Sequence, residues 1–137
     1  MPCEMQYVHK PPSDTELKCS GDCDPIYQKT QQGKFVPVKP TCRQLVQVEW
    51  VLAAKKFNPK YQVCVCTVPA ATDSPCHWEP EVDPQDTSTI TKPRCLGGCS
   101  GPYYDDAQGT TQLKMECQYF ENPTTRKIEC VCVVIKS

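Results

Sequence analysis

The sequence predicts a small, disulfide-rich, all-β protein made of two tandem units, and three observations support this fold class. Twelve of the 137 residues are cysteine, a share typical of disulfide scaffolds. Fourteen residues are proline, which interrupts helices. The same order of six cysteines occurs twice: a lone cysteine, a C-x-G-x-C segment, another lone cysteine and a C-x-C segment.

We expect each unit to be organised around its C-x-G-x-C segment, which is Cys19–Cys23 in the first unit and Cys95–Cys99 in the second. Two disulfides from this segment to the C-x-C segment would close a ring of eight residues, through which a third disulfide could pass. A side chain at the middle of the five-residue segment would project toward the threading sulfurs, whereas glycine leaves that space empty. We therefore predict that Gly21 and Gly97 have structural roles in the ring. The alternative is that they form two ordinary glycine turns. Six cysteines permit fifteen pairings, so spacing alone leaves the connectivity open.

The repeated cysteine order resembles that of the cystine-knot superfamily, which implies two tandem cystine-knot units of β-hairpin fingers. The segment Leu17–Pro25 looks especially like the corresponding stretch of the C-terminal cystine-knot and bone-morphogenetic-protein antagonist group. The opening spacing of four cysteines is also similar to that of the tick chemokine-binding evasins, whose later cysteines do not end in C-x-C. The cystine-knot resemblance implies ring disulfides and one threading disulfide in each unit: Cys19–Cys64, Cys23–Cys66 and threading Cys3–Cys42, then Cys95–Cys130, Cys99–Cys132 and threading Cys76–Cys117.

The cysteine repeat divides the chain into unit 1 at residues 1–66, a linker at residues 67–75 and unit 2 at residues 76–137. The linker contains small residues and two prolines, and Val68 is its one large apolar residue. Units of this size bury too little apolar surface to be stabilised comfortably by a core alone. Three disulfides in each unit, at about 2–4 kcal/mol each, would supply the difference.

Cysteine content and charge restrict the environment and the class of partner. Disulfides in this number persist only in an oxidising compartment, so we expect a secreted, extracellular protein whose signal peptide has been removed. No run of apolar residues long enough for membrane insertion occurs. The formal charge is +3 over residues 1–66 (nine Lys/Arg, six Asp/Glu) and −4 over residues 67–137 (six against ten). This pattern is unlike the basic footprint of a nucleic-acid-binding protein.

In unit 1 we expect a first finger with strands at residues 4–9 and 15–18 around a tip at Lys10–Asp14. The segment between Cys23 and Cys42 contains three prolines and Gly33, which disfavours a helix in this heel loop. The longest regular pattern of apolar residues comes after Cys42. Apolar residues alternate with other residues there and predict a strand with one apolar face: Val46, Val48, Trp50 and Leu52. A second-finger tip at residues 55–60 then returns through residues 61–66.

Unit 2 repeats this plan with a different surface. Residues 79–86 form an acidic first-finger tip, residues 101–106 an acidic heel with two tyrosines, and residues 122–125 the tip of a shorter second finger. We expect Trp78 to stack beside the threading disulfide of this unit. The two units should cover one another's apolar strand faces, which predicts a monomeric pseudo-dimer.

Two loops are the candidate partner-binding sites, because loops on a rigid frame commonly carry recognition. The first is the basic tip, and the second is the acidic heel. Ordinary solvated loops are the alternative in both cases. The candidate residues are Lys55, Lys56, Phe57 and Lys60 in the basic tip and Tyr103, Tyr104, Asp105 and Asp106 in the acidic heel.

The sequence favours protein binding over catalysis. The two histidines are in different units, no nucleophile motif is present, and the cysteines are accounted for as six pairs, so we expect no enzyme activity, no bound metal and no cofactor. One hypothesis is a secreted cystine-knot signalling ligand or antagonist that binds a receptor or growth factor through its finger and heel loops. The alternative is a parasite salivary-type scavenger that sequesters a host cytokine, chemokine, complement factor or protease.

Overall fold

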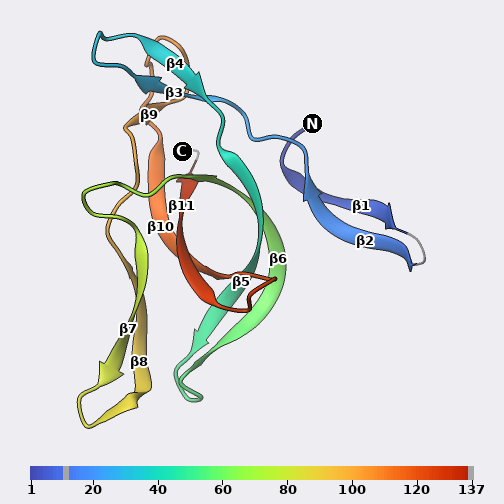
Figure 1. Ribbon diagram of the computed structural model, residues 1–137, viewed down its shortest axis with the longest axis vertical. Coiled ribbons are helices and arrows are strands. Elements are labelled where there is room, and N and C mark those ends of the chain that lie inside the picture. The colour runs from blue at the N-terminus through green and yellow to red at the C-terminus, as the bar shows by residue number, and fades with distance from the viewer. Residues whose placement is uncertain (11–12, 136–137) are drawn as a thin grey trace.

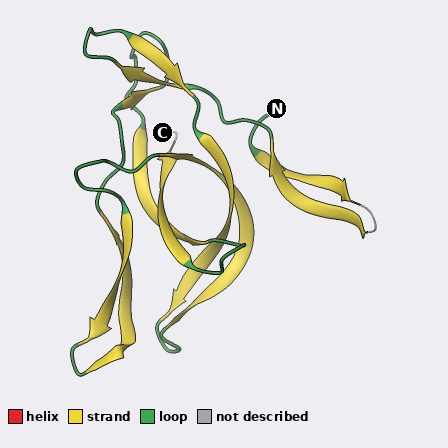
Figure 2. Cartoon of the chain, viewed as in Figure 1, coloured by secondary structure: helices red, strands yellow, loops and turns green. Residues whose placement is uncertain are grey.

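The computed structural model describes residues 1–10 and 13–135, and within them every regular element is a strand. The predicted small, disulfide-rich, all-β fold is therefore confirmed. Four long antiparallel hairpins and one small sheet account for the architecture (Figures 1 and 2). The strands are β1 (Glu4–Lys10), β2 (Ser13–Ser20), β3 (Ile26–Lys29), β4 (Phe35–Val38), β5 (Thr41–Val51), β6 (Lys56–Val68), β7 (His77–Asp83), β8 (Asp86–Leu96), β9 (Tyr103–Tyr104), β10 (Lys114–Glu121) and β11 (Ile128–Ile135).

The four hairpins are the predicted fingers. β1–β2 and β5–β6 come from the first cysteine repeat, and β7–β8 and β10–β11 from the second. The first-finger strands are longer than predicted, and of the tip predicted at residues 10–14, Pro11 and Pro12 lie outside the described residues. The predicted strand at 46–52 also begins earlier, at Thr41, and ends at Val51.

The two second fingers close into one four-stranded barrel in the order β10–β11–β6–β5 (Figure 1). β11 pairs with β6 through Cys132↔Val68 and Val133↔Thr67, and β10 meets β5 at the pair Glu121↔Val46. The heels join in the same way, because β9 of the second repeat pairs with β3 of the first in the sheet β4–β3–β9. Each shared sheet thus contains strands from both repeats.

The six disulfides are the pairs that the cystine-knot resemblance implies, with Cα–Cα distances of 5.7–5.9 Å. In the first repeat, Cys19–Cys64 and Cys23–Cys66 close a ring of eight residues, and the same ring occurs in the second repeat. The sulfur of Cys3 lies within 4.8 Å of the sulfurs of Cys23 and Cys66. Each third disulfide therefore lies directly beside a ring disulfide, since Cys117 of the second repeat has the same proximity to Cys95 and Cys130.

Gly21 and Gly97 have the predicted steric role, but the obstacle is different. Their φ angles are +91° and +88°, a region that side chains rarely occupy. A Cβ on Gly21 would lie 2.1 Å from the carbonyl oxygen of Pro2, and one on Gly97 would lie 2.2 Å from that of Pro75. The glycines thus make room for the backbone that immediately precedes the third disulfide, and not for its sulfurs as the sequence suggested.

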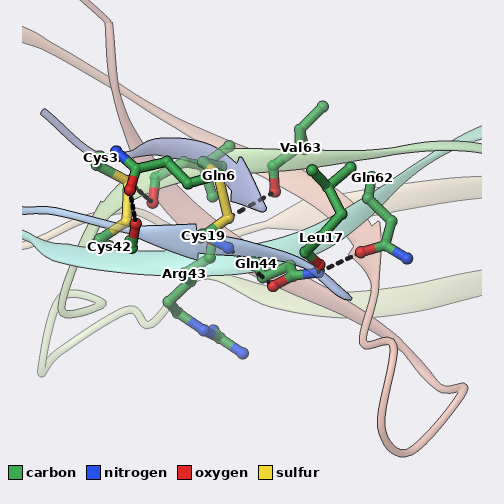
Figure 3. The surroundings of a disulfide bond; sticks show 12 residues. Cys3, Gln6, Leu17, Cys19, Cys42, Arg43, Gln44, Gln62 and Val63 are labelled. Carbon is green, nitrogen blue, oxygen red and sulfur yellow. Dashed lines mark hydrogen bonds between the residues drawn. A yellow bond between two sulfur atoms is a disulfide. The ribbon is translucent and has the colours of Figure 1, made fainter. Parts of the chain in front are cut away.

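The first finger of the first repeat is anchored by Gln44 on β5 (Figure 3). The side-chain oxygen of Gln44 accepts a hydrogen bond from the amide of Cys19 at 3.0 Å, and its amide nitrogen donates to the carbonyl of Leu17 at 3.4 Å. The same nitrogen also donates to the side chain of Gln62 on β6. β2 is held at its cysteine end, while the rest of the β1–β2 hairpin extends away from the barrel (Figure 1).

The segment predicted as a linker at residues 67–75 is not a free spacer. Thr67 and Val68 complete β6, and Val68 is buried because it packs in the core beside Cys132. The residues that follow are fixed by backbone hydrogen bonds, from Ser100 to the carbonyl of Pro69 and from Ala71 to that of Gly98, both at 3.0 Å. The buried side chain of Val68 and these hydrogen bonds attach this segment to the folded structure.

Two buried clusters form the core, and both combine residues from the two repeats. The barrel cluster contains Leu45, Phe120, Val131 and Val133, and the heel cluster contains Ile26, Val68, Cys76, Tyr103, Leu113 and Cys132. The predicted apolar stripe of β5 is only partly used. Val46 and Val48 are buried and Trp50 is half-buried, but Leu52 is 67% exposed because it lies in the turn after the strand ends.

Candidate partner-binding surface

The basic tip is the turn between β5 and β6 together with the first residues of β6. The turn closes when the amide of Lys55 donates to the carbonyl of Val51 at 2.7 Å, with Lys55 in the left-handed region at φ 52°. Lys55, Lys56 and Lys60 are exposed, as a partner-binding role requires. The ammonium of Lys60 lies 3.3 Å from a carboxylate oxygen of Glu49, whereas Lys55 and Lys56 have no ion-pair partner among the described residues.

Phe57 does not project from the basic tip into solvent. Its ring lies at the centre of an aromatic cluster, with centroids 5.1 Å from Trp50, 5.3 Å from Trp78 and 5.1 Å from Tyr119, all edge-to-face. Trp78 of the second repeat is therefore packed against an aromatic ring of the first repeat. The half-buried Phe57 fastens the β5–β6 finger to β7 and β10 and so fixes the position of the lysines.

The acidic heel is a structured loop whose predicted contact residues are largely engaged within the protein. Tyr103 is 3% exposed and its hydroxyl is hydrogen-bonded to that of Ser100 at 2.7 Å, so its ring belongs to the core and is not presented at the surface. Tyr104 is half-buried against Phe35, with ring centroids 5.2 Å apart. The loop is short and each tyrosine follows the alternation of β9, which directs Tyr103 into the core.

The two aspartates of the acidic heel cap backbone amides of the loop that follows. Asp106 Oδ1 accepts from the amides of Gln108 and Thr110, both at 3.0 Å, and Asp105 Oδ1 accepts from Thr111 at 3.1 Å. These hydrogen bonds, chiefly those from Thr110, favour the charged carboxylate and lower the pKa of Asp106 below its ordinary value of 3.8. Asp105 remains exposed, so of the four acidic-heel candidates it is the one with a largely free surface.

Sequence reasoning missed the basic residues that the second repeat places near the β5–β6 finger. Arg126 and Lys127, at the turn between β10 and β11, read in the sequence only as residues flanking a short tip. The structure places Arg126 against β6, where it lines a groove of about 270 Å³ together with Lys60 and Tyr61. The sequence signal was the dibasic pair itself, which repeats Lys55–Lys56 at the equivalent finger.

The clusters of potential metal ligands in the described part of the chain consist of cysteines alone. Among the side chains that the structure describes, the clusters of potential metal ligands are Cys3, Cys23 and Cys66 in the first repeat and Cys95, Cys117 and Cys130 in the second. All six sulfurs are in disulfides and cannot act as thiolate ligands. No helix capable of crossing a bilayer occurs in the part of the chain that the structure describes.

Comparison with known proteins identifies no relative of this chain. No family model, curated protein or solved structure shows significant similarity to it.

Proposed function

We propose that this protein is a secreted, non-enzymatic, cystine-knot-type protein that binds an extracellular protein and inhibits it. The disulfide density suits an oxidising, extracellular environment. Threading of the third disulfide through each eight-residue ring is part of the proposal. Its support is the proximity of the Cys3 sulfur to those of Cys23 and Cys66 and the contact of residues 1–2 with Gly21.

The observation that carries the binding function is the basic tip on its braced finger. Three exposed lysines lie on a hairpin that is fixed by the Phe57 cluster and by the barrel, so little conformational entropy is lost when a partner binds. Such a preorganised charged surface suits recognition of a folded protein of opposite charge.

An inhibitor agrees better with the asymmetry of the molecule than a signalling ligand does. A ligand that clusters two receptors presents two equivalent surfaces, but here the two repeats differ. The β5–β6 tip extends beyond the barrel and packs on Trp78, whereas the β10–β11 turn lies against β6. A molecule with one such surface occupies one partner, which fits an antagonist of a growth factor or receptor or a scavenger of a soluble mediator.

The test is a binding screen with the oxidised protein on an interferometry sensor. The panel contains secreted growth factors, chemokines, complement factors, proteases and receptor ectodomains, and the reduced and alkylated protein is the control. We expect one or more specific partners that bind the oxidised form alone, in a 1:1 complex by light scattering, with inhibition of the partner's activity. A 1:2 complex with a receptor that signals in cells would establish the ligand alternative, and absence of any oxidised-form binding would refute the proposal.

A further inference from the structure

The turns of the two second fingers are built alike, although their sequences share no motif. Residues 51–55 read VLAAK and residues 122–126 read NPTTR. In each turn the amide of the fifth residue donates to the carbonyl of the first, from Lys55 to Val51 at 2.7 Å and from Arg126 to Asn122 at 2.8 Å. The fifth residue is left-handed in both turns, with φ 52° at Lys55 and 63° at Arg126.

The residue type at this fifth position is unexpected. Glycine or asparagine adopts the left-handed region at lower cost, so a long basic side chain there is energetically unfavourable. Within residues 1–10 and 13–135, Lys55 and Arg126 are the non-glycine residues with positive φ. A second cation follows each of them, Lys56 and Lys127. Backbone strain that recurs with the same charge at two equivalent turns points to a function for that charge.

Folding does not account for these four cations. All four are exposed, and none is within ion-pairing distance of a carboxylate among the described residues. Since they stabilise no internal ion pair, an external anionic group is the partner that their charge fits.

The groove between β6 and the β10–β11 turn is lined by one of these cations, Arg126, and by Lys60, whose ammonium also lies 3.3 Å from a carboxylate oxygen of Glu49. It measures about 270 Å³ and has Lys60 from the first repeat and Arg126 from the second on its walls. Its remaining lining is mixed, because the 58% exposed ring of Tyr61 and the rings of Pro59 and Pro123 lie beside the carboxylate of Glu121. A peptide with both carboxylate and aromatic side chains matches the two cations and the rings of this lining, whereas a uniform polyanion has no group that packs on the rings.

We propose that this basic groove, defined as Lys60, Tyr61 and Arg126 and extended by Lys56 and Lys127, binds an extended acidic peptide segment that contains aromatic residues. The inference rests on the proposed protein-binding function and specifies the part of the partner that is recognised. Lys56 and Lys60 are four residues apart on β6, about 13 Å at the rise of a strand. A segment of about four to six extended residues spans that length.

The test uses a fluorescein-labelled octapeptide of alternating glutamate and tyrosine, with binding measured by fluorescence anisotropy at low and at physiological salt. We expect binding that weakens with salt. Arg126→Asn should weaken it by about tenfold, because one charge-assisted contact is lost. Asparagine accepts the left-handed conformation, so this variant keeps the turn while it removes the cation. Lys60→Gln, which lies outside the turn, should reduce affinity similarly.

The matched control is the double variant Lys34→Gln, Lys39→Gln. It removes two exposed charges in the heel of the first repeat, away from the groove, and should change the affinity less than about twofold. Unchanged binding by both groove variants would overturn the proposal. So would equal or tighter binding of octaglutamate or of a heparin octasaccharide, because either result indicates a simple polyanion surface.

The same variants separate this inference from the proposed function. If a protein partner from the screen binds the Arg126→Asn and Lys60→Gln variants as tightly as the natural protein, the groove is not its binding site and the inference fails while the proposed function stands. If the octapeptide competes with that partner and both variants weaken its binding, the groove is supported as the recognition site.

Discussion

At the scale of single residues, the two ring glycines show how one missing Cβ decides whether a disulfide framework can form. Gly21 and Gly97 occupy the same position in the two repeats. A Cβ at either position would lie 2.1–2.2 Å from a backbone carbonyl oxygen, which is closer than any side chain tolerates. The neighbouring backbone is fixed there as well, because the amide of Asp22 donates to the carbonyl of Met1 at 2.7 Å. Movement of either segment would displace the adjacent third disulfide.

We expect Gly21→Ala and Gly97→Ala each to prevent native pairing in its own repeat. The added methyl group would lie 2.1–2.2 Å from a backbone oxygen, in addition to the cost of positive φ. Gly33→Ala is the matched control, since Gly33 also has positive φ (+82°) but no atom lies within 4 Å of its Cβ position. That control should lose only about 1 kcal/mol and keep all six disulfides. The readout is non-reducing peptide mapping after oxidative refolding, and native mapping of both ring variants would disprove the steric explanation.

At the scale of elements, the aromatic cluster explains why the β5–β6 finger keeps one orientation beyond the barrel. A two-stranded hairpin is marginal by itself in water. Phe57 supplies the missing support by contacting the rings of Trp50 on its own finger and of Trp78 and Tyr119 on the second repeat. The finger that presents the basic tip is therefore stabilised by side chains far away in sequence.

We expect Phe57→Ala to lower the free energy of unfolding by about 2 kcal/mol, below the usual cost of a fully buried phenylalanine because the ring is half-buried. Three edge-to-face contacts are lost together. Leu52→Ala, in the same turn region but 67% exposed, should change stability by less than about 0.5 kcal/mol. Urea unfolding with intact disulfides, followed by tryptophan fluorescence, measures both. Equal effects of the two substitutions would mean that the cluster contributes little.

At the scale of the whole molecule, the two repeats share the barrel, the heel sheet and the buried clusters. The barrel and heel cores are shared between them. An ion pair also joins them, since the guanidinium of Arg43 on β5 lies 2.7 Å from the carboxylate of Glu129 on β11, with both side chains about one-third exposed. At this exposure the pair contributes modestly, and the shared apolar clusters provide most of the association.

We therefore expect neither repeat to fold by itself, because separation exposes the apolar faces of Leu45 and Val68 or of Phe120 and Val133. Residues 1–75 and 69–137, expressed separately and oxidised, should give mixed disulfides or self-association in non-reducing electrophoresis and size-exclusion chromatography. The full chain should be a 15.4 kDa monomer by light scattering. A monodisperse half with its three native disulfides would contradict the shared core.

The fold class, the four fingers and the importance of the two ring glycines were predictable from the sequence. Cysteine spacing, strand alternation and proline placement are local signals, and local chemistry is sufficient to indicate strands and turns. The disulfide pairs followed from the resemblance to cystine knots, because fifteen pairings of six cysteines satisfy the same spacing.

How the repeats combine, and which candidate residues are free, depends on tertiary packing. Tyr103 and Phe57 look alike in sequence as aromatic residues among charges, yet packing buries the first in the core and places the second in an inter-repeat cluster. Arg126 and Lys60 line one groove only because the two second fingers close into one barrel. Such contacts depend on pairing between strands that are distant along the chain, and sequence periodicity contains no information on which distant strands will meet.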